Sequence, residues 1–346
     1  MGMNKLLIAS LVVIVVLAGV SFGRGEDKEE SCALAQRQQE FKHEPYYIGP
    51  LVDAHAHMPV SSGIVSLVGQ RIGFPGMTSF GGKLSIDYLH CLSKSEGILK
   101  TISFFMPTKF SLGAEVRTAQ KAEKKYLGEF APFLMPAPYS FLRISLKSVR
   151  DTLDKNPGLF KGIGEVKVMD GTRLDNPYFS EMFRIADEYS LVIMMHPFPD
   201  DKALVKKIVG QYPNVTFLLH VGHDSEWITE GMEEYDNLYY SLDADIASLY
   251  GWNREHKNKE PSKKEWLSHV RENFDSLLAE ELRFWKPRIE AYPDRFMWGT
   301  DRWYAWHFER EVGDLLEEYG RSFIGRLSPG AREKFAHKNA EKILKN

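Results

Sequence analysis

The chain has few cysteines and little net charge. Its 346 residues include two cysteines, Cys32 and Cys91, and neither belongs to a CxxC pair, which excludes a cysteine-rich zinc module or redox motif. A structural disulfide and two free thiols remain open for them. The formal net charge is -3, and no cluster of Lys and Arg alternates with aromatic residues, so nucleic acid is not an expected partner. With 43% hydrophobic residues, the composition is that of a globular protein.

The amino-terminal segment differs from the rest. A continuous apolar run over residues 6–20 follows Lys5 and precedes small residues up to Gly23. This pattern is typical of a signal peptide over residues 1–23, with export to the periplasm or the exterior. An uncleaved membrane anchor is the alternative, since about 17–25 apolar residues span a bilayer. Residues 24–49 are polar and charged and predict a stalk or surface arm.

The remainder, residues 50–346, alternates short apolar runs with segments of helical spacing. The predicted strands are 51–57, 99–106, 132–137, 162–168, 191–196, 215–221, 238–243 and 296–301. The predicted helices between them include 112–130, 145–155, 180–189 and 201–212. Such alternation indicates the α/β class with a parallel sheet, and eight units favour a closed (β/α)8 barrel forming one catalytic domain.

Three further segments complete the predicted barrel. Residues 61–82 are rich in Gly and Ser and predict a long loop after the first strand. Residues 250–292 predict a helical insertion before the last strand. Its tryptophans are expected to form a small core of the insertion; they are Trp252, Trp266 and Trp285. Residues 331–344 predict a terminal helix that packs on the barrel.

Two histidines close the first predicted strand, in the motif Asp53-x-His55-x-His57. Because side chains alternate along a strand, the motif predicts Asp53, His55 and His57 on the same side. Imidazole is a common ligand of first-row metals, so this pair is expected to bind a metal rather than to form a hydrogen-bonded core pair.

Three other polar residues close later strands, namely His196, His220 and Asp301. Alone, each His would be a satisfied core residue and the Asp a helix cap. In a barrel, however, all strand ends converge at one end, so the five side chains are expected to meet. Burying them together without a cation would be costly, which predicts a divalent metal site.

With these motifs the chain resembles the amidohydrolase superfamily from Val52 to the carboxyl terminus. The resemblance rests on the first-strand motif, on His196 and His220 closing the fifth and sixth strands, and on Asp301 closing the eighth. It implies one or two divalent metals, commonly zinc, and hydrolysis of amides, esters, lactones or phosphoesters. A minority of such proteins decarboxylate their substrates.

The fourth strand bears on the number of metals. Glu165 resembles the bridging Glu of TatD-like hydrolases, whereas phosphotriesterase-type proteins use a carboxylated Lys, for which Lys167 is the candidate. A bridging Glu165 would place His55, His57 and Asp301 on one metal and His196 and His220 on the second. Without the bridge, His55, His57, His196 and Asp301 would hold a single metal, and His220 would polarise the water. Glu165 could also be an internal partner for Lys167 or Arg173.

Further roles follow from the resemblance and from position. Asp301 is expected to be the general base, and Asp53 is expected to orient a ligand or neighbouring backbone. Arg302, His223 and Tyr139 are candidates for binding a small-molecule substrate, although an ion pair is an equal alternative for Arg302.

The sequence therefore predicts an exported metal-dependent hydrolase. A mononuclear decarboxylase on the same scaffold is the main alternative. Less favoured alternatives are a metal-binding or sugar-binding protein without activity and a TatD-like nuclease. A membrane is expected as a partner only if residues 1–23 are retained, and a homo-oligomer remains open.

Overall fold

The computed structural model describes residues 32, 41–71, 78–81, 83–220, 227–242 and 261–345. The chain divides into two compact units, Met1–Ala33 and Leu34–Asn346, and the strands and helices given below lie in the second. The predicted signal peptide lies outside the described residues, as does most of the predicted arm. Both cysteines are disulfide-bonded. Among the described residues, no helix has the length and apolar character needed to cross a membrane.

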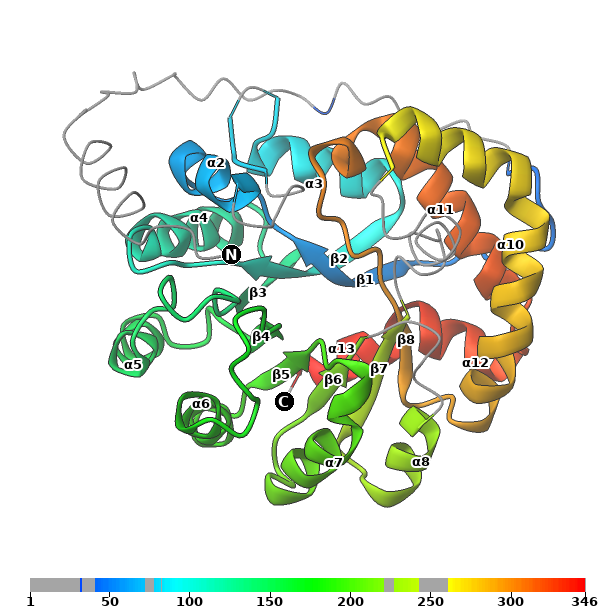
Figure 1. Ribbon diagram of the computed structural model, residues 1–346. Coiled ribbons are helices and arrows are strands. Elements are labelled where there is room, and N and C mark those ends of the chain that lie inside the picture. The colour runs from blue at the N-terminus through cyan, green and yellow to red at the C-terminus, as the bar shows by residue number, and fades with distance from the viewer. Residues whose placement is uncertain are drawn as a thin grey trace, which may run out of the picture. The chain divides into compact units, whose positions relative to one another are not determined.

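Eight parallel strands follow one another in chain order around a barrel, with helices outside them (Figure 1). The strands are β1 (Leu51–His57), β2 (Ile98–Phe105), β3 (Phe130–Leu134), β4 (Gly162–Val166), β5 (Val192–Met195), β6 (Phe217–Leu219), β7 (Leu238–Leu242) and β8 (Phe296–Trp298). A parallel bridge between Ala56 and Arg302 joins the first strand to the segment after the last. The predicted (β/α)8 barrel is confirmed, with strand ends shifted by a few residues.

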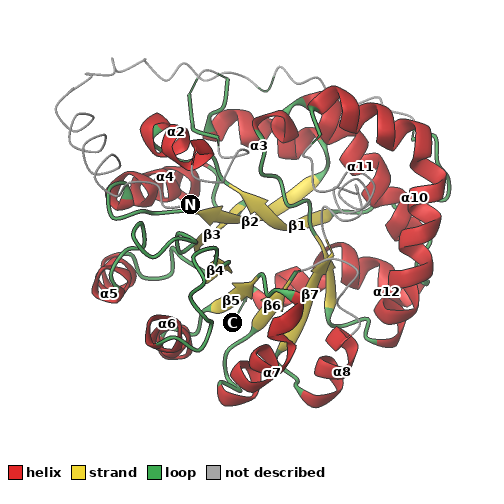
Figure 2. Ribbon diagram, viewed as in Figure 1, coloured by secondary structure: helices red, strands yellow, loops and turns green. Residues whose placement is uncertain are grey.

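Helices surround the strands, as Figure 2 shows. They are α2 (Gly63–Arg71), α3 (Ile86–Ser95), α4 (Leu112–Lys125), α5 (Leu146–Lys155), α6 (Pro177–Glu188), α7 (Lys202–Gln211), α8 (Trp227–Glu234), α10 (Lys263–Ala291), α11 (Arg310–Gly325), α12 (Pro329–Glu333) and α13 (Asn339–Ile343). Helix α6 illustrates how they form: the Asn176 side chain accepts a hydrogen bond from Tyr178 N, and Pro177 occupies the first turn. Phe179, Met182 and other apolar residues at helical spacing then face the sheet.

The segment after β1 is partly helical, so the prediction of a continuous loop over 61–82 is wrong. Helix α2 forms there because Ser62 can cap its first turn, with Val65 N 3.5 Å from Ser62 Oγ, and apolar residues recur at helical spacing. Its entry is fixed by Glu115 of α4, which accepts hydrogen bonds from Ser61 N and Ser61 Oγ, both at 2.8 Å.

The predicted insertion before the last strand contains α10, a helix of 29 residues. Ser262 and Glu265 form a capping box at its start. Trp285 stacks on Tyr240 of β7 with ring centroids 5.0 Å apart, and both belong to the main buried cluster. The expectation that the insertion has its own core is therefore wrong for Trp266 and Trp285, which pack into that cluster; Trp252 lies outside the described residues.

The barrel interior and the layer between strands and helices are distinct apolar clusters. The inner cluster includes Val52 and Ala54 of β1, whereas Ala56 and Met58 belong to the outer cluster. A register shift between Asp53 and Ala56 explains the change, because an extra residue in a strand reverses the alternation of its side chains. The predicted common side for Asp53, His55 and His57 is therefore wrong. Asp53 lines a small cavity on the outer side with Ala56.

The carboxyl-terminal segment is helical, as predicted, and closes the other end of the barrel. Ala340 and Ile343 belong to the inner cluster. Asn339 Nδ2 donates to the carbonyl oxygens of Pro293 and Phe296, at 2.8 and 2.7 Å, where β8 begins. The strands finish at the other end, where His55, His57 and Asp301 lie.

Candidate metal centre

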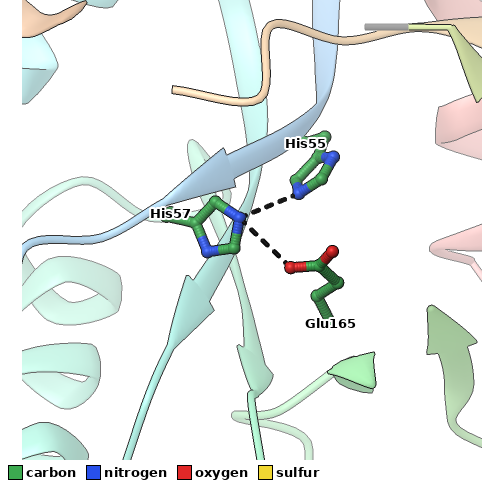
Figure 3. Close-up of side chains that lie close together, drawn as sticks. All are labelled: His55, His57 and Glu165. Atoms are coloured by element: carbon green, nitrogen blue, oxygen red, sulfur yellow. Dashed lines mark hydrogen bonds and ion pairs between the residues drawn. The ribbon is translucent and has the colours of Figure 1, made fainter. Parts of the chain in front are cut away.

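His55 and His57 lie at the end of β1 and point into the barrel. Their Nε2 atoms are 3.1 Å apart, and both rings contact Phe104 of the inner cluster, with centroid distances of 5.0 and 5.7 Å. In Figure 3 both rings direct a nitrogen toward the space that Glu165 also faces. Phe104 thus packs against both imidazoles and limits their movement.

Glu165, on β4, lies between two groups of histidines. Its Oε2 is 3.4 Å from His57 Nε2, whereas its Oε1 is 2.8 Å from His196 Nδ1 and 2.6 Å from His220 Nε2. The preceding Gly164 has φ +145°, and a Cβ there would lie 2.5 Å from the backbone oxygen of Met194. Only glycine fits this conformation and this close approach, which bring the carboxylate between the two groups.

Asp301 follows β8 and completes the group on the His55 side. Its Oδ1 lies 3.3 Å from His55 Nε2 and 3.2 Å from His57 Nε2. Its φ is +44°, which is uncommon for a residue other than glycine. Its backbone N–H donates to the His55 carbonyl at 2.8 Å, so β1 holds Asp301 in this conformation.

Asp53 joins β1 to the segment after β8 by hydrogen bonds on the outer side of the barrel. Its Oδ1 accepts hydrogen bonds from the backbone N–H groups of His55 and Thr300, at 3.0 and 2.9 Å. Its Oδ2 accepts from Thr300 Oγ1 at 2.7 Å. Despite facing the other way from His55, it orients neighbouring backbone, which is the kind of role expected for it. Burial raises the Asp53 pKa to about 6, although Thr300 and Arg302 act against this.

The protonation states of the site residues suit metal binding. Burial raises the pKa of Glu165, but His220 and Lys167 outweigh it and hold that pKa well below the usual value. Likewise, the pKa of Asp301 is lowered by His55 and His57 against the effect of burial. Burial lowers the pKa of His57, and burial together with Lys167 lowers that of His196 to about 4. At neutral pH these carboxylates are ionised and these imidazoles neutral, the forms that bind metals.

The donor set fits divalent metals. Three overlapping groups each place their ligand atoms within 4.8 Å of one another: His55 with His57 and Glu165, His55 with His220 and Asp301, and Glu165 with His196 and His220. His57 Nδ1 is buried and has no hydrogen-bond partner among the described residues, so hydrogen bonding fixes the ring only through Nε2. A largely buried cluster of two carboxylates and four imidazoles is the environment that a cation would stabilise.

The Arg302 side chain makes a buried ion pair and is not available to bind a substrate. Its Nη2 donates to Glu96 Oε2 at 2.7 Å, and both side chains are almost fully buried. Its backbone oxygen accepts from His57 N at 2.9 Å. The ion-pair alternative therefore describes Arg302, and its expected role in substrate binding is corrected.

The other predicted residues have different outcomes. Tyr139 follows β3 and packs against the inner cluster, as Trp303 does. Lys167 follows β4 and lies close enough for its charge to lower the pKa values of Glu165 and His196. Arg173 pairs with Asp175 at 3.1 Å, not with Glu165. His223 lies outside the described residues.

Sequence reasoning missed His307 as part of the surroundings of the site. It is 4% exposed, and its Nδ1 accepts a hydrogen bond from Trp303 N at 3.1 Å. Burial lowers its pKa to about 3, so it is a neutral acceptor. His307 lies in a short turn and belongs to no recognisable sequence motif. Its spacing of four residues from Trp303 is the one local feature that could have indicated a contact between them.

Comparison with known proteins gives a family match and structural neighbours. A family model described as amidohydrolase matches residues 153–345, whereas no curated protein matches the sequence. An amidohydrolase from Burkholderia multivorans with bound zinc has a TM-score of 0.57 at 12% identity, covering 86% of this chain and 99% of that chain. Its form with bound HEPES gives 0.55 at 13% identity with the same coverage. These two likenesses show a shared fold.

A third structure is that of a 5-carboxyvanillate decarboxylase from Novosphingobium aromaticivorans, complexed with manganese and 4-hydroxy-3-methoxy-5-nitrobenzoic acid. It is 16% identical, with a TM-score of 0.49, and covers 86% of this chain and 96% of that chain.

Proposed function

Because this chain belongs to the amidohydrolase family, we propose that it hydrolyses a small-molecule ester, lactone, amide or phosphoester at a site for two divalent metals. The position of Glu165 carries this proposal. Its two oxygens face different groups, His57 on one side and His196 with His220 on the other. A carboxylate placed between two groups of imidazoles can bind two cations at once.

The residues divide between the two positions as follows. His55, His57 and Asp301 would hold one metal, His196 and His220 the other, and Glu165 both. Bound divalent metals would lower the pKa of a water molecule and polarise the oxygen of the scissile group. The zinc in the Burkholderia multivorans relative supports zinc as the metal.

Asp301 is the proposed general base. It is ionised at neutral pH and more exposed than most of the other site residues, with 27% of its side chain accessible. One carboxylate oxygen accepts a proton from the attacking water as the water oxygen bonds to the carbonyl carbon or phosphorus. The protonated carboxyl then donates that proton to the leaving group as the scissile bond breaks. One water is consumed, and Asp301 returns to its ionised form.

Export remains part of the proposal. The apolar run over residues 6–20 and the small residues before Gly23 support a signal peptide. Sequencing the mature amino terminus of protein recovered outside the cytoplasm tests this, and an intact Met1 on all recovered protein would favour the anchored alternative.

The primary test is the metal content of the purified chain, measured by elemental analysis without added metal. We expect about two divalent metals per chain and loss of ester or lactone hydrolysis after treatment with a chelator. A double variant, His55→Ala with His57→Ala, should lose metal, while the exposed pair Lys147 and Asp151 offers control positions remote from the cluster. Metal content unchanged in the double variant would contradict the site. One metal per chain would favour the mononuclear alternative, including decarboxylation.

A further inference from the structure

The site residues differ sharply in their access to solvent. Side-chain exposure is 27% for Asp301 and 24% for His196, whereas it is at most 7% for His55, His57, Glu165 and His220. A substrate must therefore approach from the side on which Asp301 and His196 lie.

An aromatic residue follows each of these two exposed residues by two positions, and its ring contacts a site imidazole. Phe198 meets the ring of His196 edge-on at a centroid distance of 6.1 Å. Trp303 meets the ring of His57 edge-on at 4.6 Å. Phe198 is 45% exposed, and Trp303 is partly exposed. The two rings thus extend apolar surface directly from the cluster toward solvent.

Other exposed apolar residues lie in the segments that follow the carboxyl ends of the strands. Among the described residues, nine large hydrophobic side chains are exposed, and six of them follow the carboxyl ends of β1 to β5. These six are Ile64, Leu67, Phe110, Phe141, Met169 and Phe198. Tyr139 and Trp303 lie deeper and pack against the inner cluster. Apolar side chains concentrated at the active end of a barrel indicate binding of an apolar group, because covering them removes unfavourable contact with water.

We propose that Phe198 and Trp303 are specificity residues that bind an apolar aryl or alkyl group attached to the scissile bond. This inference rests on the proposed function, since it places that bond beside the metals and Asp301. Trp303 is suited to this role because the hydrogen bond from its backbone N–H to the buried His307 fixes its position. The preferred substrates are therefore esters, lactones or amides with an apolar substituent, rather than small polar ones.

Hydroxamates provide a direct binding test, since acetohydroxamate and benzohydroxamate share one metal-chelating group and differ in the apolar part. Calorimetric titration of the metal-loaded full chain should show benzohydroxamate binding about 10-fold more tightly or better. In Phe198→Ala and Trp303→Ala this advantage should fall to about 3-fold or less, with little change in the Kd of acetohydroxamate. Trp303→Phe should retain the tighter binding of benzohydroxamate. Leu127→Ala, which removes an exposed apolar residue between α4 and β3, is the matched control and should leave the ratio unchanged.

The outcomes separate this inference from the proposed function. If acetohydroxamate fails to bind the metal-loaded protein, the metals have no position open to a ligand, and the proposed hydrolytic function is contradicted. If both compounds bind the parent with similar Kd, the assignment of these rings is overturned. It is also overturned if Phe198→Ala keeps the preference for benzohydroxamate, or if Trp303→Phe loses that preference. Should Trp303→Ala fail to fold, Phe198→Ala still decides the result, because Phe198 is largely at the surface.

Discussion

Asp301 is joined to His55 through both its backbone and its side chain. The Asp301 N–H donates to the His55 carbonyl at 2.8 Å, and its Oδ1 lies 3.3 Å from His55 Nε2. The backbone hydrogen bond does not depend on the carboxylate. A substitution of the Asp301 side chain can therefore remove its chemical role while the backbone of residue 301 keeps its position.

Replacement of Asp301 by Asn should therefore abolish most turnover without unfolding the protein. Asn cannot accept the proton of the attacking water, and we expect kcat to fall by about 10²- to 10⁴-fold. Steady-state kinetics and thermal melting would measure the two effects, with Asp200→Asn as a surface control in the turn after β5. A variant with kcat within about twofold of the parent would contradict the general-base role.

Glu165→Gln tests the bridging arrangement. The amide has one oxygen in place of two anionic ones, so it cannot serve both metal positions equally. We expect the metal content to fall from about two per chain to about one, with a large loss of kcat/KM. Elemental analysis of the variant beside Glu188→Gln, a change at a surface ion pair, measures this. Equal metal content in parent and variant would show that Glu165 does not bridge.

Glu115 should make stability depend on pH. Burial raises the pKa of its folded-state carboxyl to about 7 from 4.5, although Ser61 acts against the shift. Since the folded state holds this proton more tightly than the unfolded state, the free energy of unfolding should decrease as pH rises from about 4.5 to 7, by at most about 3 kcal/mol.

Urea unfolding of the parent and of Glu115→Gln across this pH range measures the effect. The amide is neutral throughout and retains both an acceptor and a donor for Ser61, so this part of the pH dependence should disappear. Glu123→Gln, on the same helix, is the control. A parallel pH dependence in parent and Glu115→Gln would show that Glu115 is not its source.

The buried pair of Glu96 and Arg302 should show strong coupling. Arg302→Met removes the ion pair of the buried Glu96 carboxylate, and Glu96→Gln removes that of the buried Arg302 cation, so each should lower the free energy of unfolding by about 3–5 kcal/mol. The double variant should be less destabilised than the sum of the two. Denaturant unfolding of all four proteins gives the coupling energy, and simple additivity would argue against an energetically important pair.

Much of the fold could be predicted because its signals are local. A strand such as β1 is a short apolar run, and β1 was predicted with its observed bounds. Polar residues at strand ends likewise identified five of the six members of the cluster, since a barrel brings those ends together, whereas Glu165 was predicted from the family resemblance. The predicted loop over 61–82 contains a helix because a Ser cap and four apolar positions outweigh its glycines.

The errors at the site have a different origin. The register shift in β1 turns Asp53 to the outer face, and period-2 reasoning has no means of detecting an extra residue. The partner of Arg302 is Glu96, 206 residues earlier, so no spacing rule connects them. His307 acts through a backbone hydrogen bond to Trp303, which depends on the turn conformation alone.

The hydrogen bonds between Asp53 and Thr300 join residues 247 positions apart, and the candidate metal centre lies across the same junction of β1 with β8. One of its six candidate ligands, Asp301, meets His55 and His57 only after the last strand has been synthesised and has docked on the first. A partly synthesised chain therefore contains at most the other five candidate ligands. If the chain crosses a membrane unfolded, it must therefore take up its full complement of metal at its destination, where metal supply would limit the yield of active protein.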